Sequence, residues 1–383
     1  MSSANENRRS GTAASKALGA SAKPHGLPGQ NVLVMQGGGA LGAYQVGVYQ
    51  AMHEAGMEPD WVIGTSIGAI NAAIIAGNAP DRRLERLHDF WDQVEHRGHH
   101  AAWATLGGGI ANWLTVTGGI ASFFKPQPQA WWSPHAALGV DKAAYYSTEP
   151  LMKTLASLVD VERLSANAPR LTVGAVNVRT GLMRYFDSRD ETIQLSHVLA
   201  SGALPPAFPA VRIDGDPYWD GGIYSNTPIE AVLDDRQRRD SVIFAINVWQ
   251  SEGVEPNSIW QVMNRQKDIQ FSSRADSHIA RQKQIHRLRH IIRELSKQLP
   301  TNVQQLPEVK ELSAWGCGTT MHVVRMLAPA LPNEDHTKDI DFSAAGIRAR
   351  WESGYSQTRR MIEQAPWTVA ADPIEGVIVH ENH

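Results

Sequence analysis

NVLVMQGGGALGAYQVGVYQAMHEAGMEPDWVIGTSIGAINAAIIA, residues 31–76, holds two glycine turns, each between a strand-like run and a helix-like run. Asn31–Met35 is short, apolar and rich in branched side chains, as in a buried parallel strand. Gly37–Gly39 follow it, and apolar residues then repeat at helical spacing. Trp61–Ile63 form a second strand-like run, and Gly64–Gly68 lead into a second helix-like run rich in small residues. The pattern predicts strand, turn and helix twice, with the strands parallel.

The second turn has the form G-x-S-x-G, with Ser66 between Gly64 and Gly68. This form places the serine on a sharp strand-to-helix turn, with its hydroxyl exposed at the end of a sheet. Glycines flank it because side chains would clash in so tight a turn. The helix that follows offers unpaired N–H groups and the positive end of a dipole. The pattern favours Ser66 as a nucleophile, and a purely structural tight turn is the alternative.

The first turn can serve as an oxyanion hole. The three consecutive glycines Gly37, Gly38 and Gly39 allow several backbone N–H groups to converge on one oxygen. Gly37, Gly39 and Gly42 also match the dinucleotide fingerprint G-x-G-x-x-G, which requires an acidic residue at the end of the second strand. Asp60 has about the right separation but precedes that strand. We therefore expect no nucleotide here.

A third motif, Asp220-Gly221-Gly222, lies far downstream, directly after Tyr218-Trp219. An isolated Asp-Gly ordinarily signals a turn. Together with Gly37–Gly42 and Gly64–Gly68, however, it resembles the patatin-like phospholipase family. Ala200–Pro209 adds to the resemblance, since it is close to that family's AS-x-A-x-P-x-x-FP segment. The four motifs are ordered as in the family, and the resemblance covers about residues 30–250.

The resemblance implies an α/β fold, a three-layer α/β/α sandwich with a mostly parallel central sheet. It also implies a Ser-Asp dyad, in which Ser66 attacks the ester carbonyl and Asp220 accepts its proton, without a histidine. The expected reaction is hydrolysis of acyl esters of lipids, with oxyanion donors from Gly37–Gly39 and with no metal or organic cofactor. Leu41 departs from the pattern, because many members carry Arg or Lys there. A preference for anionic head groups therefore does not carry over.

The chain divides into three regions. Residues 1–29 lack apolar periodicity and are expected to form a disordered tail. Residues 30–250 are expected to form the hydrolase domain, with a cap-like or lid-like insertion at about 98–135. Residues 251–383 are expected to form a mainly helical extension packed on the core, which resembles the C-terminal extension of some bacterial patatin-like proteins.

The C-terminal region contains a long helical pattern over 257–299. Its apolar stripe comprises Ile285, Leu288, Ile292, Leu295 and Leu299. The helix is also rich in Lys and Arg, so it could lie on an anionic membrane surface, but packing on its own domain is the favoured interpretation. Met321–Leu327 predicts one more strand, expected at the sheet edge. Ser343 can cap a last helix that extends to about Glu363.

The insertion contains an uncharged run, Ala101–Phe124, that is rich in glycine and is followed by Trp131-Trp132. Its length suits a membrane span, but glycine runs and polar residues interrupt it. A fixed structural cap and a mobile lid over Ser66 both remain open. In the lid interpretation, Trp113 and Trp131 contact a lipid surface, because tryptophan prefers the membrane–water interface.

The composition is that of an ordinary soluble globular protein, with 383 residues, 42% hydrophobic and 20% charged. The formal net charge of −3 provides no basic field for nucleic acid. The one cysteine, Cys317, is expected to be a buried structural thiol, and His96, His99 and His100 to form a solvated turn without metal. We expect a cytoplasmic location, compatible with peripheral membrane contact. A receptor-read export signal would not be visible in the sequence.

Three alternatives stay open. A short-chain esterase, thioesterase or hydroxyalkanoate-oligomer hydrolase could use the same dyad. A Ser-His-Asp hydrolase would need a histidine after the acid, and His322 lies in a strand-like run where an exposed loop would be expected. A catalytically silent lipid-binding module would not need Ser66 and Asp220. The sequence leaves the oligomeric state open.

Overall fold

The computed structural model describes residues 26–95, 120–132, 135–165, 169–272, 275–332, 334–369, 372 and 374–381. Most of the expected N-terminal tail, residues 98–119 and 133–134 of the expected insertion, and the side chains of Trp131 and Trp132 lie outside the described residues. The expectations for His96, His99, His100 and Trp113 lie outside them as well.

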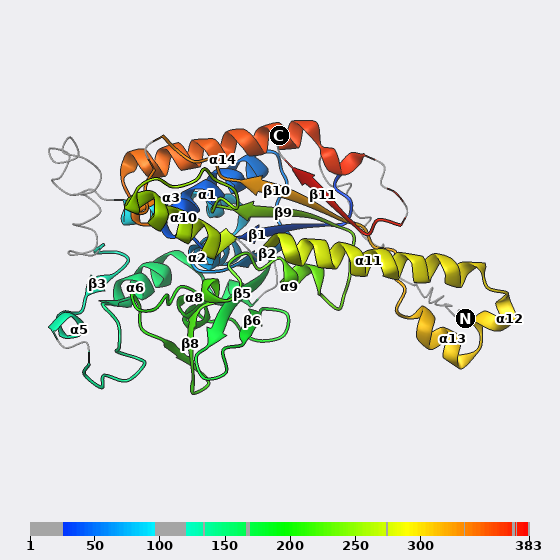
Figure 1. Ribbon diagram of the computed structural model, residues 1–383, viewed down its shortest axis with the longest axis horizontal. Coiled ribbons are helices and arrows are strands. Elements are labelled where there is room, and N and C mark those ends of the chain that lie inside the picture. Colours follow the sequence, from blue (N-terminus) through cyan, green and yellow to red (C-terminus); the bar gives the residue numbers. More distant parts are fainter. Residues whose placement is uncertain are drawn as a thin grey trace, which may run out of the picture.

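The described residues form a nine-stranded mixed sheet, ordered β11-β10-β9-β1-β2-β5-β8-β7, with β6 paired to β5. Figure 1 shows this order, from β11 and β10 beneath the last helix to β5 and β8 on the opposite side. The strands are β1 (Gln30–Met35), β2 (Trp61–Gly64), β5 (Arg170–Asn177), β6 (Met183–Asp187), β7 (Val211–Ile213), β8 (Asp216–Asp220), β9 (Ser241–Asn247), β10 (Met321–Leu327) and β11 (Val377–Glu381); β3 (Lys125–Pro126) and β4 (Tyr146–Ser147) pair separately.

Helices cover both faces of the sheet. The α-helices are α1 (Ala43–Glu54), α2 (Ile67–Ala76), α3 (Pro80–Val94), α5 (Pro128–Trp132), α6 (Glu149–Leu158), α7 (Val161–Leu164), α8 (Leu195–Ser201), α9 (Glu230–Leu233), α10 (Ile259–Ser272), α11 (Ala275–Gln298), α12 (Thr301–Gln304), α13 (Pro307–Ser313) and α14 (Ala344–Gln364). Short 3-10 helices are η2 (Gly39–Gly42), η5 (Gly221–Ile223), η6 (Lys338–Ile340) and η7 (Pro366–Thr368).

Side-chain alternation along β1 shows how the layers form. Leu33 and Met35 join a large apolar cluster with α1, α2, α3 and α14, while Val32 and Val34 join a smaller cluster with α9 and α11. Because successive side chains of a strand point to opposite faces, a strand that is apolar throughout must be covered on both sides. The three-layer α/β/α architecture with a mostly parallel sheet is therefore confirmed.

The antiparallel part of the sheet positions the third motif. One edge of β5 pairs with β2 as far as Val173 opposite Gly64, and the same edge then pairs with β8, with Ala175 opposite Asp220. The other edge of β5 is occupied by β6 over this stretch. β8 thus takes over the edge where β2 ends, and this brings Asp220 to the turn that carries Ser66.

The C-terminal region completes the sheet. β10 pairs with β9 on one side and with β11 on the other, so the expectation that Met321–Leu327 forms an edge strand is wrong. α14 lies directly on α1, where a Cβ at Gly47 would come within 1.9 Å of the Trp351 carbonyl oxygen. The Ser343 hydroxyl accepts the Gly346 N–H at 3.1 Å and caps α14, as expected.

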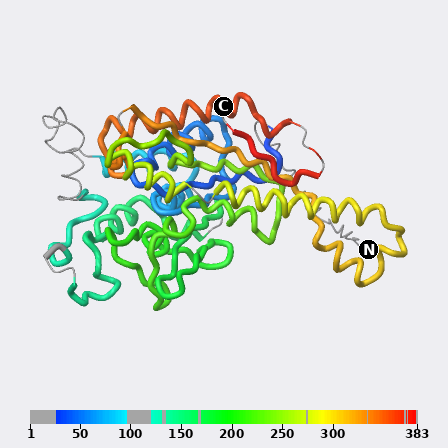
Figure 2. The backbone as a smooth tube through the Cα atoms, in the orientation of Figure 1, coloured from blue at the N-terminus to red at the C-terminus, as the bar shows by residue number. Residues whose placement is uncertain are grey.

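The long helical pattern over 257–299 forms two helices, α10 and α11. α11 packs on the sheet through Ile279, Gln282, His286 and His290, rather than through the apolar stripe expected from the sequence. Leu288 and Leu295 of that stripe are exposed. The distal half of α11 projects from the body together with α12 and α13, as the tube in Figure 2 shows, and we call this projection the arm.

Candidate active site

Ser66 lies at the turn between β2 and α2 in a left-handed backbone conformation, with φ 57° and ψ −126°. A non-glycine residue rarely adopts a positive φ, and such strain is typical of a functional position. The Ser66 N–H donates to the carbonyl oxygen and to the hydroxyl of Ser201, both at 3.1 Å. The Ser201 hydroxyl in turn donates to the Gly174 carbonyl at 2.7 Å. The turn that carries Ser66 is thus tied to α8 and to β5.

The flanking glycines are required by close packing at this turn. A Cβ at Gly64 would lie 2.3 Å from the Gly68 carbonyl carbon, and a Cβ at Gly68 would lie 2.3 Å from the Met35 carbonyl oxygen. Backbone atoms cannot move away as a flexible side chain could. The sequence argument for glycine at both positions therefore agrees with the observed geometry.

Asp220 ends β8 and is only 2% exposed. Its Oδ1 accepts the Gly222 N–H at 2.7 Å. Burial raises the pKa of the Asp220 carboxyl to about 7, while hydrogen bonding from Gly222 and from the Ser66 side chain acts in the opposite direction. Desolvation therefore dominates, and the carboxylate is a stronger base than an exposed aspartate.

The glycine loop is held by its carbonyl groups. The Gly37 carbonyl accepts from Asn226 Nδ2 at 3.0 Å and from Trp249 Nε1 at 2.8 Å. Because a trans peptide directs its C=O and N–H in opposite directions, this arrangement turns the Gly38 N–H away from both donors. The Gly37 N–H itself donates to the Asn226 carbonyl at 3.2 Å. No acceptor for the N–H groups of Gly38 and Gly39 is found among the described residues. Because the Gly37 N–H is already engaged, Gly38 and Gly39 are the candidate donors to an oxyanion.

Residues of the C-terminal region enclose the glycine loop. A Cβ at Gly39 would lie 2.2 Å from the Asp339 carbonyl oxygen of this region. On the hydrolase domain itself, a Cβ at Gly38 would lie 2.6 Å from Val248 Cγ2. Two crossed ion pairs connect η6 with α10: Lys267 with Asp339 at 2.7 Å and Asp268 with Lys338 at 2.8 Å. The C-terminal region therefore forms part of the site.

Ser66, Asp220 and Gly37–Gly39 all line one cavity of about 240 Å³. Its walls are otherwise mostly apolar, and the rings of Phe123, Phe124, Tyr146 and Phe208 pack edge to face there. Phe123 and Phe124 belong to the described end of the expected insertion. We call this the catalytic cavity; its apolar wall suits the hydrocarbon part of an ester.

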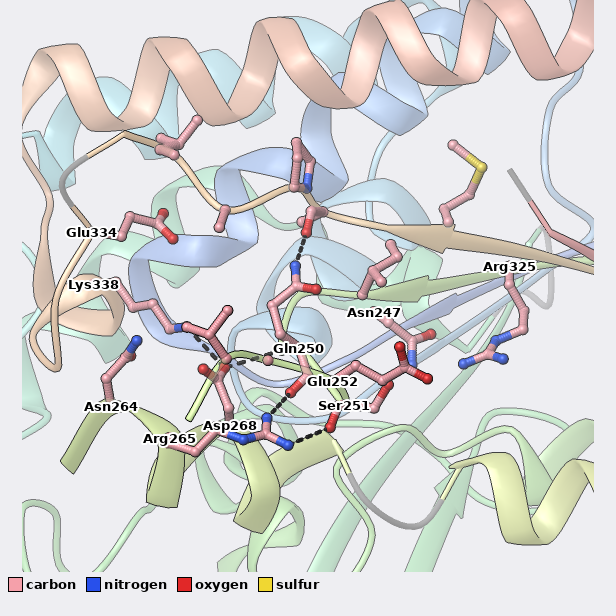
Figure 3. Close-up of a pocket in the computed structure, with 18 of the residues that line it drawn as sticks. Asn247, Gln250, Ser251, Glu252, Asn264, Arg265, Asp268, Arg325, Glu334 and Lys338 are labelled. Atoms are coloured by element: carbon pink, nitrogen blue, oxygen red, sulfur yellow. Dashed lines mark hydrogen bonds and ion pairs between the residues drawn. The ribbon is translucent and has the colours of Figure 1, made fainter. Parts of the chain in front are cut away.

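A second, larger cavity of about 810 Å³ opens nearby, beyond the carboxyl ends of β9 and β10. Polar and charged side chains line it, as Figure 3 shows, and we call it the polar cavity. Arg265 donates to the carbonyls of Gln250 and Ser251, and Arg325 pairs with Asp276 and Glu381.

Other sequence candidates lie elsewhere. His322, only 5% exposed, contacts His380 at 3.0 Å and stacks on its ring, and no histidine is among the described residues lining the catalytic cavity. Asp60 accepts the Asn31 N–H at the amino end of the strands, away from the glycine loop. Cys317 is only partly buried, so the expectation of a buried thiol is wrong.

No group of His, Cys, Asp or Glu side chains arranged to hold a metal ion occurs within the part of the chain that the structure describes. Among the described helices, none is both long and apolar enough to cross a membrane.

Three supporting residues escaped the sequence analysis. Ser201 was quoted only as part of a motif, and Asn226 and Trp249 carried no signal at all. Asn226 and Trp249 reach the Gly37 carbonyl from 189 and 212 positions away. A contact over such a separation leaves no local pattern in one sequence.

Comparisons with known proteins point to one family. A family model described as patatin-like phospholipase matches residues 33–233, and a second, described as patatin phospholipase, matches residues 269–373. Lysophospholipase nte1 of Aspergillus terreus is 54% identical over 54 residues, and lysophospholipase NTE1 of Chaetomium globosum is 52% identical over 54 residues. Each match covers 14% of this chain and only 4% of the fungal protein.

Two solved bacterial structures are distantly similar. VipD from Legionella pneumophila gives a TM-score of 0.40 at 16% identity, covering 88% of this chain and 67% of that one. ExoU, in its complex with SpcU from the type III secretion system of Pseudomonas aeruginosa, gives a TM-score of 0.37 at 17% identity. This match covers 89% of this chain and 53% of that one.

Proposed function

The chain belongs to the patatin-like phospholipase family, whose model matches more than half of it, and we propose that it is a serine acyl hydrolase that cleaves carboxylic esters of lipids through Ser66 and Asp220. The observation that supports this most is the β2–β5–β8 arrangement. It places a buried carboxylate of raised pKa and a strained serine on one apolar cavity.

The proposed reaction has two steps. Asp220 accepts the Ser66 hydroxyl proton as Oγ attacks the ester carbonyl, and the proton then passes to the departing alcohol, leaving an acyl-enzyme. A water molecule next gives its proton to Asp220 and attacks the acyl carbon, which releases the carboxylic acid and restores Ser66. Each step passes through an oxyanion, which the N–H groups of Gly38 and Gly39 would stabilise.

The polar supports of the site fit this assignment. Asn226 and Trp249 orient the Gly37–Gly38 peptide before substrate arrives, so no reorganisation is needed when charge develops. The position of His322 gives no support to a Ser-His-Asp triad. The apolar wall of the catalytic cavity supports an acyl chain, rather than a charged group, next to Ser66.

A substrate panel tests the proposal. Phospholipid, lysophospholipid, p-nitrophenyl esters of increasing chain length and an acyl-CoA would be offered to the wild type and to Ser66→Ala. We expect ester hydrolysis by the wild type and none above background by Ser66→Ala, together with loss of labelling by a fluorophosphonate. Labelling of another serine in a folded Ser66→Ala protein would refute the assignment. Activity confined to short soluble esters would instead favour the esterase alternative.

A further inference from the structure

The outward side of α10 is apolar and exposed. Ile259, Val262, Met263 and Ile269 recur at helical spacing, with Trp260 beside them, and Ile259 and Trp260 are 75% and 60% exposed. We call these five residues the α10 face. Isolated exposed apolar residues are common on protein surfaces, but a contiguous group of this kind marks an interaction site.

The α10 face adjoins the catalytic cavity. Phe271, on the inner side of the same helix, lines that cavity. Ile269 lines a neighbouring hollow together with Gly222, Ile223 and Tyr224, and Gly222 donates to the Asp220 carboxylate. The end of α10 that carries Ile269 and Phe271 therefore lies next to the reacting groups, and the rest of the α10 face extends from this end along the same helix.

The α10 face carries no charge. The one acidic residue of α10, Asp268, is buried and paired with Lys338. Its two cations are also engaged, Arg265 with carbonyl groups and Lys267 with Asp339. The remaining outward positions are the glutamines Gln261, Gln266 and Gln270. The α10 face therefore has no charged side chain that could orient a protein partner by charge complementarity. It also has no carboxylate that would repel an anionic lipid.

We propose that the α10 face docks on the surface of a lipid aggregate and delivers an ester from it to the catalytic cavity. This inference rests on the proposed lipid-ester function. An apolar helical face of this kind buries shallowly at the boundary between head groups and acyl chains, where tryptophan is favoured. The catalytic cavity then opens against the interface rather than into bulk water.

The arm provides a matched control. Leu288, Leu295 and Leu312 are 61%, 59% and 67% exposed, comparable to the α10 face. The arm, however, joins the body through His290, which contacts the Thr319 carbonyl just ahead of β10, at the amino ends of the strands. Ser66 and the glycine loop lie at the carboxyl ends. Exposed apolar side chains are thus available at two opposite ends of one molecule.

The test is vesicle sedimentation with the full-length chain. Ile259→Gln, Val262→Gln and Met263→Gln would be combined in one variant, because glutamine keeps the helix propensity and removes the apolar contact. We expect binding to phosphatidylcholine vesicles, and hydrolysis of their lipid, to fall at least about tenfold. Turnover of a soluble p-nitrophenyl ester should stay within about twofold. The triple variant Leu288→Gln, Leu295→Gln and Leu312→Gln should match the wild type in all three assays.

Salt and a local probe give two further readouts. Binding through an uncharged face should not weaken as salt is raised, whereas charge-driven binding would. A polarity-sensitive dye at Met263→Cys, in a Cys317→Ser background, should shift to the blue when vesicles are added. The same dye at Leu295→Cys should not.

Several results would overturn the proposal: unchanged vesicle binding by the α10 variant, equal loss in both triple variants, or a wild type that turns over soluble ester without binding vesicles. The last result would leave the proposed hydrolase function standing. Loss of self-association by the α10 variant in light scattering, with vesicle binding unchanged, would assign the face to a second copy. Conversely, vesicle binding through α10 without hydrolysis of any ester would support the docking face and contradict the hydrolase.

Discussion

The catalytic cavity and the polar cavity lie near each other at the carboxyl edge of one sheet, and α10 contributes to both. They differ in whether their buried charged groups have a partner of opposite charge. In the polar cavity, Asp268 is buried against Lys338 and Arg325 is paired with two carboxylates. In the catalytic cavity, Asp220 is equally buried, but no described cationic side chain forms an ion pair with it. Its pKa rises to about 7 in consequence. A buried ion pair makes each charge depend on its partner for stability, whereas an unpaired buried carboxylate provides a base.

The largest effect is expected from Asp220→Asn. Asparagine keeps the shape and still accepts the Gly222 N–H, but it cannot take a proton from Ser66. We expect kcat to fall by about four orders of magnitude, as for groups that act as one unit. His322→Gln serves as the control, and its kcat should stay within about tenfold of the wild-type value. A folded but inactive His322→Gln enzyme would favour the triad instead.

For the free energy of unfolding, the order of the two cavities should be reversed: the substitution in the polar cavity should have the larger effect. Asp268→Asn leaves Lys338 buried without a counter-charge and should cost about 3–5 kcal/mol of unfolding free energy. Asp220 has a folded pKa above its ordinary value, so its ionisation destabilises the fold as pH rises from about 4 to 7. Asp220→Asn removes that penalty and should not lower Tm at pH 8. Thermal unfolding of both variants at pH 5 and 8 would test this. A lower Tm for Asp220→Asn than for Asp268→Asn would contradict the comparison.

The oxyanion donors should be sensitive to a single methyl group. Gly38→Ala brings a Cβ within 2.6 Å of Val248 Cγ2 and should shift the Gly38 N–H. We expect kcat to fall about 100-fold with little change in KM, because the donor matters most in the transition state. Gly202→Ala also borders the catalytic cavity, but its Cβ would meet nothing closer than 3.9 Å. Steady-state kinetics should find Gly202→Ala within a few-fold of the wild type; a change confined to KM in Gly38→Ala would mean that the loop only binds substrate.

The raised pKa of Asp220 predicts a pH profile. Only the carboxylate form accepts the Ser66 proton, so kcat/KM should rise with pH and level off above about 7. At pH 5, two units lower, it should be about 100-fold below the plateau. A soluble ester would be measured in buffers of constant ionic strength. A profile that is already flat from pH 5 upward would show that Asp220 is not the titrating base.

The smallest effect is expected from Ser201→Ala. It removes the hydroxyl that accepts the Ser66 N–H and donates to Gly174, but the Ser201 carbonyl still accepts that N–H. We expect a loss of about tenfold in kcat, because the nucleophile remains intact but is oriented less well. Ser201→Thr keeps the hydroxyl and should recover part of the loss. Unchanged kcat in Ser201→Ala would show that the Ser201 carbonyl alone positions the turn that carries Ser66.

Long-range pairing explains where the sequence analysis was wrong. Met321–Leu327 was expected at the sheet edge, yet β11, formed by Val377–Glu381, pairs alongside it. The apolar stripe of α11 suggested its packing face, but the helix instead buries Gln282, His286 and His290. Periodicity shows that a helix has an apolar side, and only the neighbours of that helix decide which side is covered.

By itself, the sequence determined the two strand–turn–helix units, because glycine turns and apolar periodicity are local properties of the chain. Its four ordered motifs carried the resemblance to the family, and that resemblance implied the α/β class. It also singled out Ser66, Asp220 and the glycine loop as candidates. The tertiary structure alone decided that β8 follows β2 along one edge of β5, which brings Asp220 to Ser66. It also decided that Asn226 and Trp249 hold the Gly37 carbonyl and that η6 closes on Gly39. The contacts of Gly37 and Gly39 join segments more than 100 residues apart. The burial that raises the pKa of Asp220 exists only once the chain has folded.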